Sequence, residues 1–312
     1  MSKKTRPLRI DCHADTPLWL LKQPSLAELP QAHSDYRRIA GYLDVAVLAL
    51  WTDEAEYAGR EAGHFRRLLQ LLLDDIAAVP AAPRLLLYRE QLLEPSCPLA
   101  LLAMEGASPL GARCEHLSAY IERGLRMIGL TWNGDNSYAG GCAGDIGISA
   151  DGLELIELCE QSGVVVDGAH LSRRSFWELT RAAKKPFIVS HTCCDALHPY
   201  RRNLDDEQLK AVAEAGGVVG VTFVPDFLGL SRDIAAVGAH IRHALRIAGT
   251  EAVAIGSDFD GTQLPDGMEG LQSLPLLYDA LCAAGVDEAV IEKVAGENMR
   301  RVLTDLLPRQ TA

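Results

Sequence analysis

The amino-acid sequence predicts a single-domain (β/α)8 barrel, or TIM barrel, that covers residues 1–312. Eight short apolar segments alternate with longer amphipathic segments, which is the pattern of parallel strands joined by crossover helices. The chain length fits one such barrel, because the fold takes about 250 residues plus insertions. An open, doubly wound sheet would give the same local alternation, so the positions of the polar residues decide between the two folds.

The expected strands are mostly hydrophobic, and several are near-continuous runs of Val, Ile and Leu. Such runs are expected where a strand is covered on both faces. In chain order the expected strands are Leu8–Cys12, Leu43–Leu50, Leu99–Met104, Leu125–Thr131, Val164–Asp167, Phe187–Ser190, Val218–Phe223 and Ala252–Ser257.

Three of the intervening segments carry clear helix signals. In Ser149–Gly163, the serine is a suitable N-cap and the glycine a suitable C-terminal end. In Asp205–Gly216, Asp205 and Gln208 have the spacing of a capping box. The third segment, Ile234–Gly249, is amphipathic at helical spacing. Each of these helices follows an expected strand, as the barrel requires.

Composition excludes several classes of protein. The formal net charge is −12 and no basic cluster follows the first nine residues, so no nucleic-acid partner is expected. No apolar run reaches about 18 residues, so no membrane-spanning helix is expected. The N-terminal segment has no apolar signal core, and the expected location is therefore the cytoplasm. The eight scattered cysteines form no C-x-x-C pair, which indicates reduced thiols rather than disulfides or a thiolate zinc site.

The first expected strand runs into the segment Asp11-Cys12-His13-Ala14-Asp15. His13 and Asp15 are two residues apart, so their side chains leave the same face of an extended chain. An imidazole nitrogen and a carboxylate oxygen in this arrangement can bind one metal ion. The triplet by itself is a weak signal, since such a triplet often arises by chance and also fits a capped turn.

Four further expected strands end in residues able to bind a metal or move a proton. Glu105 follows the third strand, His170 the fifth, His191 the sixth and Asp258 the eighth. Each of these residues alone is compatible with a structural role, although a buried carboxylate is costly unless it is paired. Because the carboxyl ends of barrel strands converge on one rim, the five strand ends together predict a metal site there.

At this point the ordered motifs resemble the membrane dipeptidase (renal dipeptidase-like) family of zinc peptidases, which have an amidohydrolase-type barrel. The resemblance runs from residue 11 to about residue 303 and covers nearly the whole chain. The segments that carry it are D-C-H-A-D-T, A-M-E-G, G-L-R-M-I-G-L-T-W-N, V-D-G-A-H-L-S, V-S-H-T, R-R-N-L-D-D, I-G-S-D-F-D-G and G-E-N-M-R-R-V-L.

The resemblance implies a site for two divalent metal ions, with zinc as the first expectation. His13 and Asp15 would bind one ion, His170 and His191 the other, and Glu105 would bridge both. Imidazole and carboxylate ligands suit zinc, and manganese, cobalt or iron fit the same set of ligands.

The resemblance also implies residues that act on the substrate. Arg202, eleven residues after His191, would hold the terminal carboxylate of a dipeptide, which a guanidinium grips with two parallel hydrogen bonds. Asp258 would take up and return a proton. Animal members of the family have L-T-H after the fourth strand, where this chain has Leu130-Thr131-Trp132. Trp132 therefore replaces a substrate-contacting histidine, and a changed substrate specificity is expected.

The expected function is metal-dependent hydrolysis of dipeptides by a metal-activated hydroxide. One alternative is a related amidohydrolase that acts on another C–N bond, in an N-acyl amino acid or a cyclic amide. A second alternative is a non-enzymatic metal-binding protein, although the chain fills every expected ligand position. The expected partner is a small-molecule dipeptide, with no nucleic acid and no membrane, and a homodimer would fit the resemblance.

Overall fold

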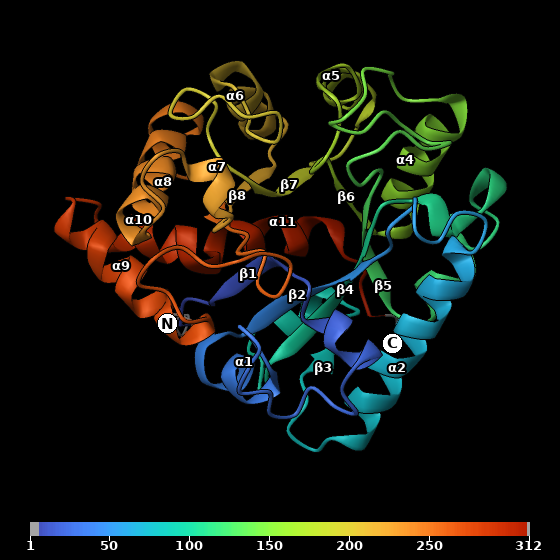
Figure 1. Cartoon of the computed structure of the whole chain (residues 1–312), viewed down its shortest axis with the longest axis horizontal. Helices are drawn as coiled ribbons and strands as arrows, with labels where there is room; N and C mark the ends of the chain where they lie inside the picture. The colour runs from blue at the N-terminus through green and yellow to red at the C-terminus, as the bar shows by residue number, and fades with distance from the viewer. Residues whose placement is uncertain (1–5, 311–312) are drawn as a thin grey trace.

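Eight parallel strands form a closed barrel in the computed structural model, which describes residues 6–310 (Figure 1). The barrel strands are β1 (Ile10–Ala14), β2 (Val45–Trp51), β4 (Leu99–Glu105), β5 (Leu125–Gly129), β6 (Val165–Asp167), β7 (Ile188–Thr192), β8 (Val218–Val221) and β9 (Val253–Ile255). Strands that follow each other along the chain are neighbours in space, and the pairing of β1 with β9 closes the ring. The two-residue strand β3 (Arg84–Leu85) pairs with β4 beside the barrel.

The closed parallel barrel confirms the predicted fold class. Each of the eight expected strands overlaps an observed one, and the ends differ by no more than two residues. The most informative difference is that β1 and β7 continue through His13 and His191, which were expected to follow these strands. Backbone pairing depends little on side-chain polarity, so a strand can extend beyond its apolar residues.

Helices surround the barrel on its outer side (Figure 1). The α-helices are α1 (Tyr36–Tyr42), α2 (Glu61–Ala78), α3 (Leu117–Glu122), α4 (Ala150–Ser162), α5 (Arg173–Ala182), α6 (Asp206–Glu214), α7 (Pro225–Leu228), α8 (Ile234–Ala248), α9 (Leu274–Ala283), α10 (Glu288–Glu292) and α11 (Asn298–Leu306). Short 3-10 segments are η1 (Thr16–Leu21), η2 (Arg89–Leu92), η3 (Ser108–Leu110), η4 (Ala112–Cys114) and η5 (Leu271–Ser273), and η6 (Lys293–Glu297) is a π-helical turn.

The structure contains the three helices that the sequence signals predicted, with their capping hydrogen bonds. The Ser149 side chain accepts a hydrogen bond from the backbone of α4, and Gly163 ends that helix with a left-handed φ of 69°. Asp205 and Gln208 form both halves of the capping box at α6. The predicted helix in Ile234–Gly249 is α8, which Asp233 caps.

Helix α11 closes the amino-terminal end of the barrel. Its residues Met299 and Val302 belong to the same buried cluster as Ile10 and Val218, which stand at the beginnings of their strands. A second cluster lies between the strands and the surrounding helices. The amino-terminal end is thus filled with apolar side chains, and polar chemistry is left to the carboxyl-terminal end.

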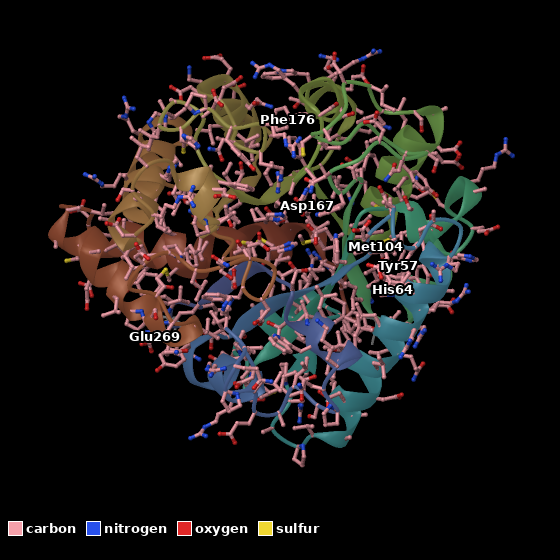
Figure 2. The ribbon with its side chains drawn as sticks, viewed as in Figure 1. Tyr57, His64, Met104, Asp167, Phe176 and Glu269 are labelled. Atoms are coloured by element: carbon pink, nitrogen blue, oxygen red, sulfur yellow. The ribbon has the colours of Figure 1, made fainter. Side chains whose placement is uncertain are left out.

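Alternation along β4 directs a carboxylate into the barrel. Leu99, Leu101 and Ala103 belong to the interior cluster, so Glu105, two residues further on, points inward as well. Figure 2 shows Asp167, the last residue of β6, near the centre of the view, whereas Glu269 lies at the periphery. The barrel interior therefore carries acidic groups at its carboxyl-terminal end.

Two expectations from composition can be compared with the structure. No helix within residues 6–310 is long and apolar enough to cross a membrane. All eight cysteines lie in this range and are free thiols, as the absence of a pairing pattern indicated.

Candidate metal centre

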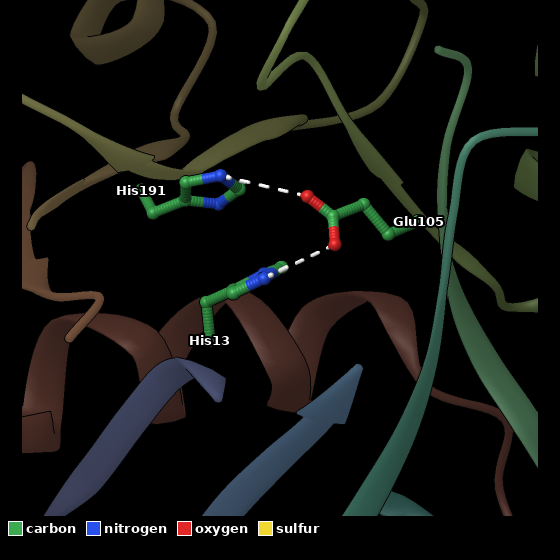
Figure 3. A group of neighbouring side chains, drawn as sticks. All are labelled: His13, Glu105 and His191. Atoms are coloured by element: carbon green, nitrogen blue, oxygen red, sulfur yellow. Dashed lines mark ion pairs between the residues drawn. The ribbon is translucent and has the colours of Figure 1, made fainter. Parts of the chain in front are cut away.

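Four of the residues singled out from the sequence meet at the carboxyl-terminal end of the barrel, and Figure 3 shows three of them, His13, Glu105 and His191. Oε1 of Glu105 lies 2.8 Å from Nε2 of His170 and 3.7 Å from Nε2 of His191. Oε2 of the same carboxylate lies 3.5 Å from Nε2 of His13. The two oxygens of Glu105 therefore face different imidazoles.

Two more carboxylates complete the group around His13. Metal-binding atoms of His13, Asp15 and Asp258 lie within 4.8 Å of one another, as do those of His13, Glu105 and His191. Gly261 makes this crowding feasible, because a Cβ at that position would lie 2.0 Å from an Asp15 oxygen and 2.4 Å from an Asp258 oxygen. His13 is thus common to both groups of three.

Burial and charge set the protonation of the centre. Burial lowers the pKa of His170 to about 4, and the nearby Arg202 charge acts in the same direction. Burial and the charge on His13 hold the pKa of His191 well below its usual value. His170 and His191 are therefore neutral near pH 7, and the neutral imidazole is the form that binds a metal.

The carboxylates show opposite shifts. Burial alone raises the pKa of Glu105, but the positive charge on nearby His13 outweighs burial and lowers the pKa. Burial raises the pKa values of Asp15 and Asp258, and the Glu105 charge adds to both shifts. Like charges crowded at one buried point favour a bound cation.

Unpartnered polar atoms provide a direct test of whether this group suits a metal. Nε2 of His13 and Oδ1 of Asp15 are buried and have no hydrogen-bond partner among residues 6–310. Nε2 of His170 and Nε2 of His191 lie only 2.8 Å apart and point at each other. Burying such atoms without a partner is costly, and coordination of a cation removes that cost. The residues present fit metal binding.

Local backbone strain helps to aim two of these side chains. His170 and Asp258 have φ angles of 66° and 63°, in the left-handed region that non-glycine residues rarely adopt. Each such residue costs about 1–3 kcal/mol and persists where the surrounding structure enforces it. Two of the five non-glycine residues with a positive φ in the described part of the chain are thus predicted site residues.

Arg202 lies beside the metal centre with few partners of its own. Its side chain is buried, its Nη2 donates to the backbone oxygen of His191 over 3.3 Å, and its guanidinium lies 5.5 Å from the ring centre of Phe227. Among residues 6–310, no carboxylate forms an ion pair with Arg202. It lines a cavity of about 400 Å³ together with His170. The guanidinium is thus available to an anionic ligand.

Trp132 lies on the rim beside a predicted ligand. Its ring centre is 6.3 Å from that of His170 and 5.0 Å from that of Trp51, which it meets edge to face. The side chain is partly exposed rather than enclosed in the core. Its position is the one expected for a residue that borders a substrate.

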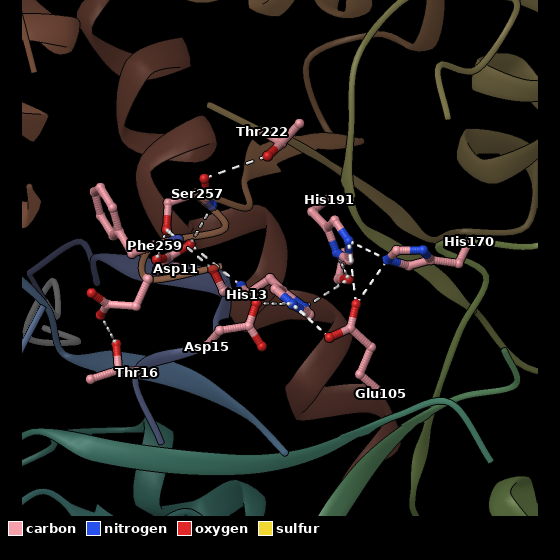
Figure 4. Close-up of polar contacts among 12 residues, drawn as sticks. Asp11, His13, Asp15, Thr16, Glu105, His170, His191, Thr222, Ser257 and Phe259 are labelled. Atoms are coloured by element: carbon pink, nitrogen blue, oxygen red, sulfur yellow. Dashed lines mark hydrogen bonds and ion pairs between the residues drawn. The ribbon is translucent and has the colours of Figure 1, made fainter. Parts of the chain in front are cut away.

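Sequence reasoning missed the residues that hold the predicted ligands in place, and Figure 4 labels two of them, Asp11 and Ser257. Oδ1 of Asn133 accepts a hydrogen bond from Nδ1 of His170 at 3.0 Å. Asp11 and Asp167 accept hydrogen bonds from two buried serines, Ser257 and Ser190. One signal was available, because both aspartates stand shortly before a predicted ligand, in D-C-H and V-D-G-A-H.

Comparisons with known proteins find relatives that match most of the chain. The model of the membrane dipeptidases (Peptidase family M19) matches residues 4–309. An uncharacterized protein in the pqqA 5′ region of Klebsiella pneumoniae is 35% identical over 223 residues, which make up 67% of this chain and 82% of that protein.

Solved structures resemble the whole chain. The dipeptidase AC, a metallo peptidase of family M19, has a TM-score of 0.89 and 25% identity, and the match covers 97% of this chain and 99% of that one. A metallo peptidase from Rhodobacter sphaeroides has a TM-score of 0.88 and 25% identity over 97% of this chain and 100% of the other. That protein is liganded with a phosphinate mimic of the dipeptide L-Ala-D-Ala.

Proposed function

Since the chain belongs to the membrane dipeptidase family, we propose that it is a metal-dependent dipeptidase. The observation that carries this proposal is the position of Glu105, one oxygen of which faces His170 and His191 while the other faces His13. The dipeptide mimic bound by the Rhodobacter sphaeroides relative supports a dipeptide as the substrate class.

The proposed metal ligands are the five residues expected from the sequence. His13 and Asp15 would hold one divalent ion, His170 and His191 a second, and Glu105 would contact both. Zinc suits these ligands best. Bound in this way, two ions supply Lewis acidity and lower the pKa of water towards neutrality.

Asp258 is proposed to move the proton. It stands next to Asp15 and His13, and its backbone N–H donates to the His13 carbonyl, which fixes its place on the rim. Burial raises the pKa of its carboxyl group towards the working range of a general base. An Asp258 oxygen would accept the proton of the attacking water and return it to the nitrogen of the leaving amine.

Arg202 is proposed to bind the substrate's terminal carboxylate. The guanidinium is buried, has no carboxylate partner among the described residues and lines a cavity that reaches His170. A carboxylate there would gain two parallel charge-assisted hydrogen bonds. This contact would orient the dipeptide so that its peptide bond lies over the imidazole cluster.

Trp132 favours one alternative function, the hydrolysis of a C–N bond other than that of a dipeptide. Beside His170, its indole offers one fixed N–H donor and no titratable proton. A substrate with a different group at this position, such as an N-acyl amino acid or a cyclic amide, would be hydrolysed by the same residues.

The deciding experiment is a substrate panel on metal-reconstituted protein. It contains dipeptides with L- and D-residues at each position, their C-terminal amides, N-acyl amino acids and cyclic amides. Metal-dependent cleavage confined to dipeptides with a free carboxylate is the expected result. Cleavage of only the other amides would replace the proposal with the alternative, and no metal-dependent cleavage of any of them would reject both.

A further inference from the structure

One buried hydroxyl group contacts imidazoles on both sides of Glu105. Oγ of Ser190 in β7 lies 2.9 Å from Nδ1 of His191 and 3.4 Å from Nδ1 of His13. The same oxygen lies 2.5 Å from Oδ2 of Asp167. Ser190 is 1% exposed, so solvent does not compete for these contacts.

The Ser190 hydroxyl donates its single hydrogen to the carboxylate of Asp167. Oδ1 of Asp167 already accepts from the backbone N–H groups of Ala169 and Ser190, both at 2.9 Å. Burial raises the pKa of Asp167, and the hydrogen bonds donated to it oppose this shift. Asp167 thus accepts two hydrogen bonds at Oδ1, and its Oδ2 accepts a third from the Ser190 hydroxyl.

The oxygen of this hydroxyl can accept one hydrogen bond from each of the two rings. After donating its proton, Oγ keeps two lone pairs, and both ring contacts are made through Nδ1. Each Nδ1 must therefore carry a hydrogen, so Nε2, on the side of Glu105, is the nitrogen that is left to bind a metal. This is the tautomer that a metal bound through Nε2 requires.

We infer that Ser190, held by Asp167, is a positioning residue that fixes the Nδ1–H tautomer and the orientation of both His13 and His191. The inference rests on the proposed function only in assigning these imidazoles to metal ions. One hydroxyl thereby couples ligands that belong to the two proposed metal positions.

The barrel is shaped to accommodate this serine. Ile188 belongs to the interior cluster, so alternation along β7 directs the side chain of Ser190, two residues further on, into the interior as well. A Cβ on Gly220 would lie 1.9 Å from the Ser190 carbonyl oxygen, and one on Gly256 only 1.7 Å from it. The glycines at these two positions, one in β8 and one directly after β9, thus leave room for the Ser190 backbone.

A second serine in the same barrel provides a matched control. Ser257 donates from Oγ to Oδ2 of Asp11 at 2.5 Å and from its backbone N–H to Oδ1 at 2.9 Å, as Ser190 does to Asp167. It is equally buried, but its hydroxyl contacts the backbone oxygen of His13 instead of a ring nitrogen. Ser257→Ala therefore removes the same kind of bond without touching an imidazole.

The experiment compares Ser190→Ala, Ser257→Ala and the near-isosteric Asp167→Asn with the parent protein. In Asp167→Asn, the backbone N–H groups of Ala169 and Ser190 still need an acceptor, so the amide oxygen takes the place of Oδ1. The amide nitrogen then faces Ser190 and donates a hydrogen bond to one lone pair of Oγ. Only one lone pair is then left for two rings. Histidine labelled with ¹⁵N in the ring reports Nδ1 protonation by NMR, in the metal-free and the zinc-loaded protein, and chelator competition reports zinc affinity.

In the parent protein we expect Nδ1 of His13 and His191 to carry hydrogens in both states. Ser190→Ala should shift both signals and weaken zinc binding about 10- to 100-fold, the usual effect of losing a hydrogen bond to a ligand. Asp167→Asn should disturb at least one ring, and Ser257→Ala should leave both signals in place.

Two results would overturn the inference. One is an unprotonated Nδ1 on either ring of the parent, and the other is a Ser190→Ala variant whose ring signals match those of Ser257→Ala. A parent protein that binds no zinc would reject the proposed function instead, because the ring signals of the metal-free protein still report the role of Ser190.

Discussion

Replacing Arg202 with methionine tests the proposed recognition of the substrate carboxylate. Within the protein, the guanidinium makes one long hydrogen bond to the His191 carbonyl and one contact with the Phe227 ring. Each is worth about 1 kcal/mol, and methionine preserves much of the apolar packing. The variant is therefore expected to fold and to keep its metal content.

The loss expected in Arg202→Met is a lower kcat/KM for dipeptides. Removing one partner of a buried ion pair costs about 3–5 kcal/mol. At 1.36 kcal/mol per factor of ten, this is a fall of about 150- to 5,000-fold in kcat/KM for a dipeptide. The C-terminal amide of the same dipeptide has no charge to pair, so its kcat/KM should fall by less than about tenfold.

The assay measures kcat/KM for both substrates in the parent, Arg202→Met, Arg202→Lys and the exposed neighbour variant Arg201→Met. Lysine keeps the charge but loses the paired hydrogen bonds, so Arg202→Lys should lie between the parent and methionine. Arg201→Met should resemble the parent. An equal loss for the dipeptide and its amide in Arg202→Met would refute the reasoning.

Three further predictions concern the remaining site residues. The parent should bind about two metal ions per chain, and Glu105→Ala should lose at least one of them in elemental analysis. A parent protein with a single tightly bound ion would contradict the two-ion proposal. Asp258→Asn should lower kcat about 10²-fold or more with metal content nearly intact, and activity within a few-fold of the parent would exclude a proton-transfer role. Trp132→His should change the ranking of dipeptides by side-chain size, while Trp132→Ala should admit bulkier residues. Unchanged rankings with lower melting temperatures would make Trp132 a core residue.

The strands were readable from sequence because each is a local feature. A run such as Leu99–Met104 must be buried on both faces, and its composition shows this without knowledge of its neighbours. The strand ends were less certain, since β1 and β7 continue into polar residues that an apolar pattern does not include. Burial of all five residues in each of these strands comes from the closed barrel.

The candidate ligands were also accessible from sequence, because each stands at or near a strand's carboxyl end. Convergence of those ends in a barrel brings His13, Glu105 and His191 together, as the structure does. The supporting residues were not identified, since a buried serine or asparagine gives no distinctive pattern. Ser190 and His13 are 177 positions apart, and no local signal relates them.

By itself, the sequence determined the order of the strands and helices and the chemical groups at the strand ends. These features depend on the polarity and spacing of residues that are near each other along the chain. Only the tertiary structure decided that the two oxygens of Glu105 face different imidazoles and that one serine contacts two of them. The physical reason is that barrel closure brings strands from distant parts of the chain together, and closure is not a property of any single segment.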